Sequence, residues 1–572
     1  MEAVFFFVFF YPLFMSIFWM MGSLFFFVRR EKLHNELPKL DAHPKVSILV
    51  PCHNEEHILR DSIEQLLDNK YPNFEIIAID DGSTDRTAEI LAELVQHHEK
   101  LRVVTLTRNY GKAMALRAGA LVASAEFFMC IDADALLAKD ALFWMIEHFL
   151  KGPRVGAVTG NPRVINRGAL LARIQIGEFS AIIGMVKRSQ RNLGRLFTVS
   201  GVNACYRRAA LHDVGYWSPH TVTEDIDISW KLQLKYWDVR FEPRALTWIL
   251  VPEKLGVLWR QRLRWAQGGV EAAIRYFKDV RTWTRRRFWS VYVEYCVSVL
   301  WCYAFLFTVI CYFGTNFTPP GFWPAALYVP TLIPGWTGVI LAVTCLLQFS
   351  VGLIIDSFYE RRGLLRYLFW AIWYPAIYWF INALTTVVAV PRGIRRYGKT
   401  QYAVWKSPTR RLRDLFAWVR PRTRDHRHLF VEESWVAHSR RLTEITLTMF
   451  FWGLWIYLVL PLVSLMLWFA GIYLFVDRMI TLGGYRAFAD QLGNYATAVL
   501  LMWSLLTLWV VWNLMRYGGR HERRNVKPPH VSDKQMADSM GLTTAVVRSL
   551  RSKRSVALHF KSENRPAIDS VN

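Results

Sequence analysis

The chain has 572 residues, of which 53% are hydrophobic and 15% aromatic, and a formal net charge of +24. Its length accommodates one large soluble domain with several membrane helices, and its apolar content is high for a soluble protein. The basic residues stand beside apolar runs, which is typical of membrane proteins whose positive segments face the cytoplasm and anionic headgroups. We therefore expect membrane lipid, and no nucleic acid, as a partner. The seven cysteines form no CxxC pair, which predicts free thiols.

The first apolar run, Val4 to Val28, is long enough to cross a bilayer and ends at Arg29-Arg30. It has neither a basic start nor a small-residue cleavage site, as a signal peptide would have. We therefore expect residues 1–30 to form an anchor that leaves the next domain in the cytoplasm.

Between about residues 40 and 276, short apolar strands alternate with helical segments. This alternation predicts an α/β domain with a parallel, doubly wound sheet. Ligands of such sheets bind beyond the carboxyl ends of the strands. The candidate strands are Val46–Pro51, Ile76–Ile79, Leu101–Leu106 and Phe127–Ile131.

Carboxylates follow several of these strands, and a structural role explains them poorly because unpaired carboxylates repel one another and resist burial. Asp132 and Asp134 stand two residues apart and point the same way, so they suit Mg²⁺ or Mn²⁺ that also binds a substrate diphosphate. A chance loop sequence is the alternative for this pair. The other acidic candidates for donor binding are Glu55, Asp80 and Asp81.

The run Asp80-Asp81-Gly82-Ser83 has the alternative of an Asx turn that starts a helix. Lys112 follows Gly111 near the start of a predicted helix, where it can meet a phosphate. Its alternative is a solvated surface lysine.

Asp225, in Thr223-Glu224-Asp225, is the candidate general base, because a carboxylate in contact with an acceptor hydroxyl can take its proton. Glu224 and Asp227 are competing candidates. A capping role at the helix predicted over Ile226–Leu234 is the structural alternative.

The run Gln261-Arg262-Leu263-Arg264-Trp265 is a candidate acceptor site. Trp265 offers a face to a sugar ring, and Arg264 and Gln261 can bond diphosphate and hydroxyl groups. An interfacial amphipathic helix with Trp at headgroup level is the alternative.

These motifs, in this order between membrane segments, resemble those of the processive family 2 glycosyltransferases, the group of cellulose, chitin and hyaluronan synthases. Roughly residues 5 to 408 resemble the bacterial poly-β-1,6-N-acetylglucosamine synthases, most closely at 223–234 and 261–269. The resemblance implies a GT-A domain in which the DDG and DxD motifs bind nucleotide sugar and metal. It implies also that Asp225 is the base and that QxxRW holds the acceptor at a channel mouth.

Further apolar runs lie near 288–313, 336–355, 365–390, 447–474 and 497–515, so we expect about five to six transmembrane helices. Three crossings after a cytoplasmic domain would place the basic stretch 392–427 outside, against its charge. Pro375 lies in the middle of the run 365–390, which is either re-entrant or two half-helices. The sequence leaves the parity open.

The expected domains are an anchor at 1–30, the transferase at 40–276, a transmembrane channel region at 277–391, a basic linker at 392–429 and an accessory region at 430–572 with two spans. The accessory region resembles the small two-span subunit of the same synthases. That likeness implies allosteric activation by cyclic di-GMP, for which the arginines of 410–427 and 516–524 are candidates. Retention of positive loops inside is their alternative explanation.

The expected function is processive synthesis and translocation of poly-β-1,6-N-acetyl-D-glucosamine from UDP-GlcNAc, with inversion, as a biofilm exopolysaccharide of the bacterial inner membrane. Expected partners are the growing polysaccharide chain and periplasmic or outer-membrane export proteins. A hyaluronan, chitin or cellulose synthase stays open as an alternative, because the motifs alone do not separate these polymers. A non-catalytic cyclic-dinucleotide receptor is the alternative from another class.

Overall fold

The computed structural model describes residues 1–32, 36–319, 322–329, 335–360, 363–398, 438–470, 528–562 and 565–570, with scattered residues between 489 and 515. It falls into two compact units. One comprises Met1–Phe18, Ala304–Gln348 and Ser439–Asn525, and the other comprises Trp19–Tyr303, Phe349–His438 and Val526–Asn572.

The second unit is built on one sheet, which has the strand order β10-β9-β3-β2-β1-β4-β7-β6-β8-β5 in the described part of the chain. Apolar and β-branched residues dominate its central strands, as burial on both faces requires. The strands are β1 Val46–Cys52, β2 Phe74–Asp81, β3 Leu101–Leu106, β4 Phe127–Cys130, β5 Leu136–Leu137, β6 Val155–Val164, β7 Ala204–Arg207, β8 Asp238–Ile249, β9 Ser555–Ser562 and β10 Arg565–Ser570.

The sheet is mixed, which corrects the expectation of a parallel sheet. Strands β3, β2, β1 and β4 are parallel, as the alternation of strands and helices predicted. Beyond β4, however, β7 pairs antiparallel with both β4 and β6. The α/β class is confirmed. The later strands depart from the parallel pattern because β7, which follows α6, η2 and α7 (residues 170–192), enters the sheet between β4 and β6 in the opposite direction.

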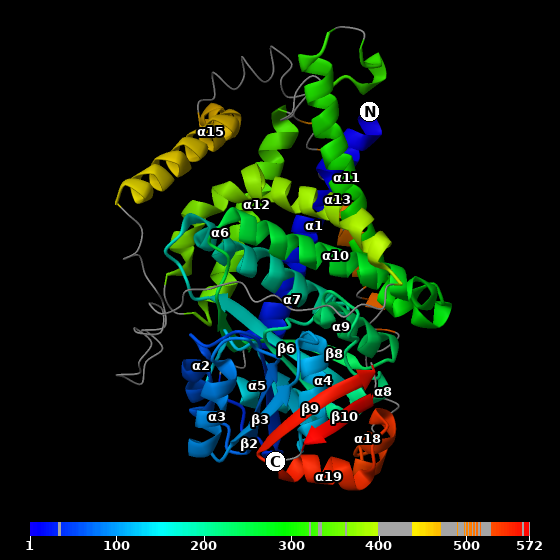
Figure 1. The fold of residues 1–572 in the computed structure, drawn as a ribbon. Coiled ribbons are helices and arrows are strands. Elements are labelled where there is room, and N and C mark those ends of the chain that lie inside the picture. Colours follow the sequence, from blue (N-terminus) through cyan, green and yellow to red (C-terminus); the bar gives the residue numbers. More distant parts are fainter. Residues whose placement is uncertain are drawn as a thin grey trace. The chain divides into compact units, whose positions relative to one another are not determined.

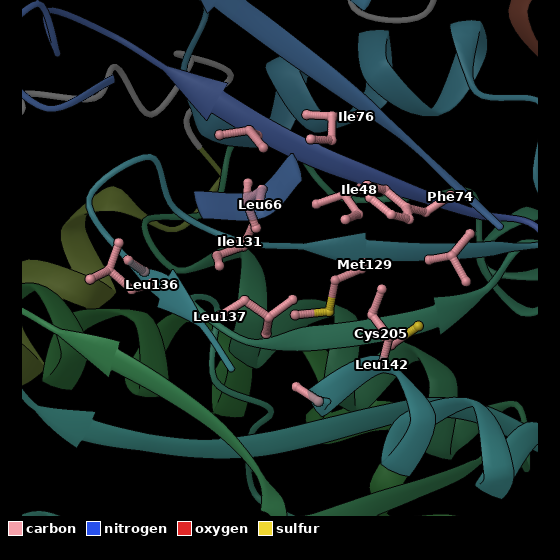
Figure 2. Packing of buried hydrophobic residues seen from close by; sticks show 14 of the residues in the cluster. Ile48, Leu66, Phe74, Ile76, Met129, Ile131, Leu136, Leu137, Leu142 and Cys205 are labelled. Atoms are coloured by element: carbon pink, nitrogen blue, oxygen red, sulfur yellow. The ribbon is translucent and has the colours of Figure 1, made fainter. Parts of the chain in front are cut away.

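Helices cover both faces of this sheet. The described helices between residues 32 and 282 are α2 Leu59–Leu67, α3 Thr87–His97, α4 Lys112–Val122, α5 Ala141–Lys151, α6 Leu170–Glu178, η2 Phe179–Gly184, α7 Met185–Asn192, α8 Arg208–Asp213, α9 Glu224–Leu234 and α10 Leu255–Val280. Figure 2 shows part of one core, where Leu66 of α2 and Leu142 of α5 pack with Ile48, Met129 and Cys205 of the strands. A second core includes α4.

Three described helical segments are long and apolar enough to cross a membrane: Glu2–Glu31, Trp283–Phe317 and Thr337–Ser357. They contain α1 Glu2–Phe26, η1 Phe27–Glu31, η3 Trp283–Phe288, α11 Trp289–Phe317 and most of α12 Gly335–Ser357. These segments coincide with three of the runs expected to span. Two further described helices are η4 Ala325–Leu327 and α15 His438–Ala470, the latter in the accessory region.

The run 365–390 is not one continuous helix. It consists of η5 Leu364–Ile372, η6 Tyr374–Tyr378 with Pro375 in its first turn, and α13 Trp379–Arg396. Proline cannot donate the backbone hydrogen bond that a regular helix needs, so the chain changes its helix type there. The interruption is therefore observed, and the choice between a re-entrant run and two half-helices stays a prediction.

The C-terminal residues return to the transferase sheet. Helices α18 Asp533–Met540 and α19 Thr544–Ser552 come first, and α18 begins with a capping box between Ser532 and Gln535. Strand β9 then pairs in parallel with β3, and β10 pairs antiparallel with β9. Figure 1 shows these strands in red beside the sheet. The sequence likeness of this tail to an accessory subunit gave no hint of this pairing.

Candidate active site

The acidic motif at the end of β2 shapes a neighbouring loop. Asp81 accepts hydrogen bonds from the backbone N–H groups of Tyr110 and Gly111, both at 2.8 Å. Burial raises the pKa of Asp81 to about 6, although these two hydrogen bonds oppose the shift. Asp80 accepts the N–H of Ser83 at 3.0 Å, and burial raises its pKa too. Both aspartates therefore organise turns, and the Asx-turn alternative describes part of their role.

Lys112 links the two later acidic motifs. Gly111 has a φ of +89°, which lets the chain turn sharply into α4, whose first residue is Lys112. The Lys112 Nζ lies 2.5 Å from Asp132 Oδ1 and 3.1 Å from Glu224 Oε1. Burial opposes its charge, but these carboxylates raise the pKa of Lys112 above its usual value. The alternative of a solvated surface lysine is thus wrong.

Asp132 and Asp134 both follow β4. Asp132 contacts Lys112, and Asp134 stands two residues later in the chain. Burial raises the pKa of Asp132, Lys112 opposes that shift, and the charge of Asp134 adds to it. Carboxylates whose charges raise one another's pKa are stabilised by a nearby cation, and for Asp132 the Lys112 ammonium is one such cation.

Glu224 and Asp225 are the first residues of α9, and the structure places them in different environments. Burial opposes ionisation of Glu224, but Lys112 and Arg264 outweigh it and lower its pKa. Burial and the neighbouring Glu224 raise the pKa of Asp225 to about 6, against the opposing effect of Lys112 and Arg264. Asp225 also accepts the N–H groups of Gly201 at 3.3 Å and Ile226 at 2.9 Å. Asp227 instead accepts the Tyr276 hydroxyl at 2.7 Å.

Gly201 closes the space among these charged groups. Its carbonyl oxygen accepts from Lys112 Nζ at 3.2 Å. A Cβ at this position would lie 3.3 Å from Lys112, Glu224 and Asp225 side-chain atoms alike. A side chain here would therefore crowd all three charged groups and require small shifts of their positions.

Lys187 of α7 is a site residue that sequence reasoning missed. Its ammonium donates to the Ser200 hydroxyl, next to Gly201. Burial lowers the pKa of Lys187 to about 7, and the nearby Asp225 opposes that shift. Lys187 does not belong to any of the predicted site motifs. Its approach to Asp225 depends on how α7 packs in the fold. The amphipathic character of 185–192 was the one available signal, and it does not single out Lys187.

Helix α10 packs against the residues just before Glu224 and Asp225. A Cβ at Gly268 would lie 1.8 Å from the Oγ1 of Thr223 and 2.7 Å from its Cβ, so α10 touches the residue before Glu224. Glu271, one turn later, accepts the N–H of Val222 at 3.3 Å.

The run Gln261–Trp265 lies on α10, and its side chains differ in how far they are exposed to solvent. Arg262 is buried, donates to Glu178 at 2.6 Å and to the Tyr378 hydroxyl at 3.1 Å, and stacks on Trp265 at 4.2 Å. Arg264 is exposed and acts electrostatically on Glu224 and Asp225, while Gln261 and Trp265 are partly exposed. Arg262 thus orients Trp265, and the other three side chains are available to a ligand.

Glu55 lies after β1, where its backbone N–H donates to Thr87 Oγ1 at 2.9 Å. The contacts above join Lys112, Asp132, Glu224, Asp225 and Gly201 into one cluster. They do not connect Glu55 to that cluster, so its place in donor binding stays a prediction.

Comparison with known proteins agrees with this site. Residues 47–215 match the model of the glycosyl transferase family 2, and residues 429–565 match the PgaD-like protein model. A poly-β-1,6-N-acetyl-D-glucosamine synthase of Staphylococcus epidermidis is 41% identical over 409 residues, which is 71% of this chain and 98% of the relative. The synthase of Staphylococcus aureus strain COL is 40% identical over 408 residues, again 71% and 98%.

Among solved structures, the mannosyltransferase PcManGT from Pyrobaculum calidifontis, in complex with GDP-Man and Mn²⁺, matches with a TM-score of 0.46 and 19% identity. That match covers 69% of this chain and 97% of the mannosyltransferase. The sequence relatives carry the assignment, since they are matched over nearly their whole length. The chain joins a family 2 glycosyltransferase and a PgaD-like segment, and it belongs to the poly-β-1,6-N-acetyl-D-glucosamine synthase family.

Proposed function

We propose that this chain polymerises N-acetylglucosamine from UDP-GlcNAc into a β-1,6-linked polysaccharide. One observation carries the proposal for the site: Lys112 bridges Asp132 and Glu224, so the donor-side carboxylates and the base motif form a single cluster. The identity of the sugar and linkage comes from the family. Membranes given one UDP-sugar at a time test it. UDP-GlcNAc alone should yield polymer, and glucose, glucuronate or β-1,4 linkages would support the cellulose, hyaluronan or chitin alternatives.

Asp225 is the proposed base. A pKa of about 6 leaves its carboxylate mostly ionised at neutral pH, yet basic enough to accept a proton. The acceptor's C6 hydroxyl oxygen attacks the anomeric carbon of the donor, its proton passes to Asp225, and the bond to the UDP oxygen breaks. Attack opposite the leaving group inverts the anomeric configuration, so an α-linked donor gives a β-linked product.

Glu224 assists without taking the proton. Its lowered pKa keeps it ionised, and its carboxylate holds the Lys112 ammonium 3.1 Å away. The two neighbouring carboxylates are pushed to different pKa values, which is how enzymes divide acid and base roles between them. Lys112 then offers its positive charge to the donor diphosphate.

Asp134 and Asp132 would hold Mg²⁺ or Mn²⁺. The described residues contain no group of three or more His, Cys, Asp or Glu side chains suited to a metal. Two hard carboxylate oxygens plus the diphosphate oxygens of the substrate fit a divalent cation of this kind. When bound, it would stabilise the negative charge of the departing diphosphate. Asp80, Asp81 and Glu55 are proposed to complete the donor pocket.

Gln261, Arg264 and Trp265 are the proposed acceptor contacts. Arg262 fixes the Trp265 ring by stacking at 4.2 Å, and it is itself fixed by Glu178. A ring held in this way presents a flat face to a terminal sugar at low entropic cost.

The contacts of the membrane segments suggest their orientation. Arg188 of α7 donates to Glu31 at 2.8 Å and to Asp356 at 2.9 Å, so the ends of the first and third candidate spans meet at the transferase domain. The second candidate span begins beside that domain, with Arg285–Arg287 at its start. Two of these ends carry arginines, at Arg29-Arg30 and Arg285–Arg287. We propose that the side of the transferase domain is the cytoplasmic side of a bacterial inner membrane.

We propose that the run 365–390, which is broken at Pro375, does not cross the membrane. The basic stretch after it would then lie on the side of the transferase, in agreement with its charge. The proposed domains keep their predicted bounds, with 277–391 as channel region for the growing polysaccharide. Periplasmic or outer-membrane export proteins remain proposed partners.

Cyclic di-GMP is proposed as the activator of this site. The candidate arginines, 410–427 and 516–524, lie outside the described residues. Support comes from the PgaD-like match over residues 429–565, which joins catalytic and accessory parts in one chain. Micromolar cyclic di-GMP should raise polymer output, and an unchanged output would refute the proposal. A non-catalytic receptor, which is the alternative function from another class, would bind the dinucleotide and make no polymer.

A further inference from the structure

The transferase sheet is completed by a strand from the far end of the chain. Strand β9 pairs with β3 in parallel, with Val103 opposite Ser555 and Leu106 opposite Leu558. Without β9, β3 would present an open row of backbone N–H and C=O groups. Addition of a strand to such an edge is a common way to recognise an extended segment.

The residues before β9 share the core of the transferase. Met536 and Met540 of α18 and Val547 of α19 are buried in the same cluster as α4. Arg102 of β3 is also buried, and it donates to the backbone oxygens of Leu550 and Lys553 at 3.0 Å. The tail thus covers apolar surface and satisfies a buried guanidinium, so its docked position is strongly specified.

The end of β9 reaches the loop that carries the donor-site lysine. Tyr110 is almost fully buried, and its ring meets the Phe560 ring edge-on at 5.6 Å between centroids. The Tyr110 hydroxyl lies 3.1 Å from His559 Nδ1, and it accepts the N–H of Phe560 at 3.3 Å. Strand β9 lies beside β3, the strand that this loop follows (Figure 1).

A short chain of contacts runs from Tyr110 into the site. The N–H groups of Tyr110 and Gly111 both bind Asp81, and the next residue is Lys112, whose Nζ contacts Asp132 and Glu224. Only one residue, Gly111, separates Tyr110, whose ring contacts the tail, from Lys112. A shift at Tyr110 therefore moves Lys112 unless the loop bends elsewhere.

We propose that the C-terminal tail, residues 528–562, is a positioning element of the donor site. Its residues His559 and Phe560 hold Tyr110 and thereby fix Lys112 for the donor diphosphate. This inference rests on the proposed use of UDP-GlcNAc. It assigns the accessory part a direct structural role in catalysis, in addition to any role in the membrane.

The first test compares three variants of the full chain in lipid vesicles. Phe560→Ala removes the ring that packs on Tyr110, and Tyr110→Phe removes the hydroxyl that meets the tail. Val556→Ala is the matched control, since it also removes buried apolar atoms from β9 but does not touch Tyr110 in the contacts above. We expect the first two to raise the KM for UDP-GlcNAc by roughly 2- to 30-fold, with kcat changed less, and the control to stay near wild type.

Two outcomes would overturn the inference. One is a Phe560→Ala chain with the wild-type KM, and the other is an equal rise in KM for Val556→Ala, which would point to general loosening. Wild-type chain that makes no polymer from UDP-GlcNAc would instead refute the proposed function. The two failures are therefore distinguishable.

Two further measurements separate positioning from loss of folding. Hydrogen exchange of the segment 107–116 should be slowed by UDP in the wild type and much less in Phe560→Ala, at an unchanged exchange rate for β1. A disulfide between cysteines introduced at Thr105 and Ala557, which face each other in the register, should lock the tail and preserve activity. Loss of activity on locking, restored by reduction, would show that the docked tail inhibits and would overturn the inference.

Discussion

A single buried ammonium organises the charges of this site. Lys112 lies between Asp132 and Glu224, and its charge acts also on Asp225. The three carboxylates differ: burial raises the pKa values of Asp132 and Asp225 although Lys112 opposes this, whereas Lys112 and Arg264 together lower that of Glu224. Different pKa values within one cluster are expected where one carboxylate must accept a proton while its neighbour stays ionised.

The pKa of Asp225 predicts a pH profile. Below about pH 6 its carboxyl is protonated and cannot accept the proton of the acceptor, so activity should fall about tenfold per pH unit well below that value. Above pH 6 the base is ionised and this limb should level off. Initial rates of polymer formation between pH 4.5 and 8 test this, with UDP binding followed in parallel. A flat profile over that range, with binding intact, would exclude Asp225 as the base.

The metal assignment makes a separate prediction. Asp134→Ala should abolish the gain in UDP affinity that Mg²⁺ or Mn²⁺ provides, because the cation would lose one of its two protein carboxylates. Calorimetric titration with UDP, with and without the metal, measures that difference. Full activity of the native chain in the presence of a strong chelator would contradict the assignment.

The sequence predicted most of these residues because their motifs are local. Each acidic motif follows a strand or begins a helix, where side chains of this kind are readable from spacing. Lys187 was not predicted as a site residue, because its approach to Asp225 depends on how α7 packs and no local sequence pattern encodes that packing. The structural task of Arg262 was not predicted either, since its partner Glu178 stands 84 residues away.

At the scale of elements, the contact between α10 and the residue before α9 supports the proposed base, Asp225. Gly268 permits it, since even a methyl group there would lie 1.8 Å from Thr223 Oγ1. The same helix carries Trp265, so the proposed acceptor platform and the support of the base are parts of one rigid element.

Gly268→Ala should therefore impair catalysis. Thr223 must move to make room, and Glu224 and Asp225 follow it in sequence, so we expect a fall in kcat of roughly 100-fold, as displacements near 1 Å can cause. Gly256→Ala is the matched control in the same helix, because nothing lies within 4 Å of the added Cβ. Rates at saturating UDP-GlcNAc measure the effect. Equal rates for both variants would show that α10 does not position the base.

The elements themselves were predictable to different degrees. The parallel strands and their helices follow from periodicity, but β7 is a short strand whose antiparallel pairing is set by distant partners. Strand β9 carried a signal that was not read: Val556, Leu558 and Phe560 alternate with Ser555, Ala557 and His559, which is typical of a strand. Its place at the sheet edge came only from the fold.

At the scale of the whole chain, buried charges connect the membrane segments to the transferase. Arg163 contacts Asp356 and Glu360, and Arg188 contacts Asp356 and Glu31. Removing one partner from such a network leaves an uncompensated buried charge. The first and third candidate spans are thus anchored to the domain by their ends. The sequence alone left the number of membrane crossings open, because Pro375 in the run 365–390 is compatible with a re-entrant segment and with two half-helices.

The proposed orientation predicts opposite labelling of two positions. A cysteine in place of Phe322, which is 75% exposed between the second and third candidate spans, should react with a membrane-impermeant maleimide in spheroplasts. A cysteine in place of Arg395, at the end of α13, should react only after the membrane is opened. The parent chain with its native cysteines gives the background. Labelling of the Arg395 position in sealed spheroplasts would contradict this topology.

The most direct test of the central claim compares Asp225→Asn with the wild-type chain in purified form. The substitution keeps the size of the side chain but removes the proton acceptor at the centre of the site. The wild type should convert UDP-GlcNAc into β-1,6-linked polymer, and the variant should lose on the order of 100- to 10,000-fold in rate while binding UDP with similar affinity. Polymer formation by Asp225→Asn within about threefold of the wild-type rate would contradict the assigned base and the mechanism built on it.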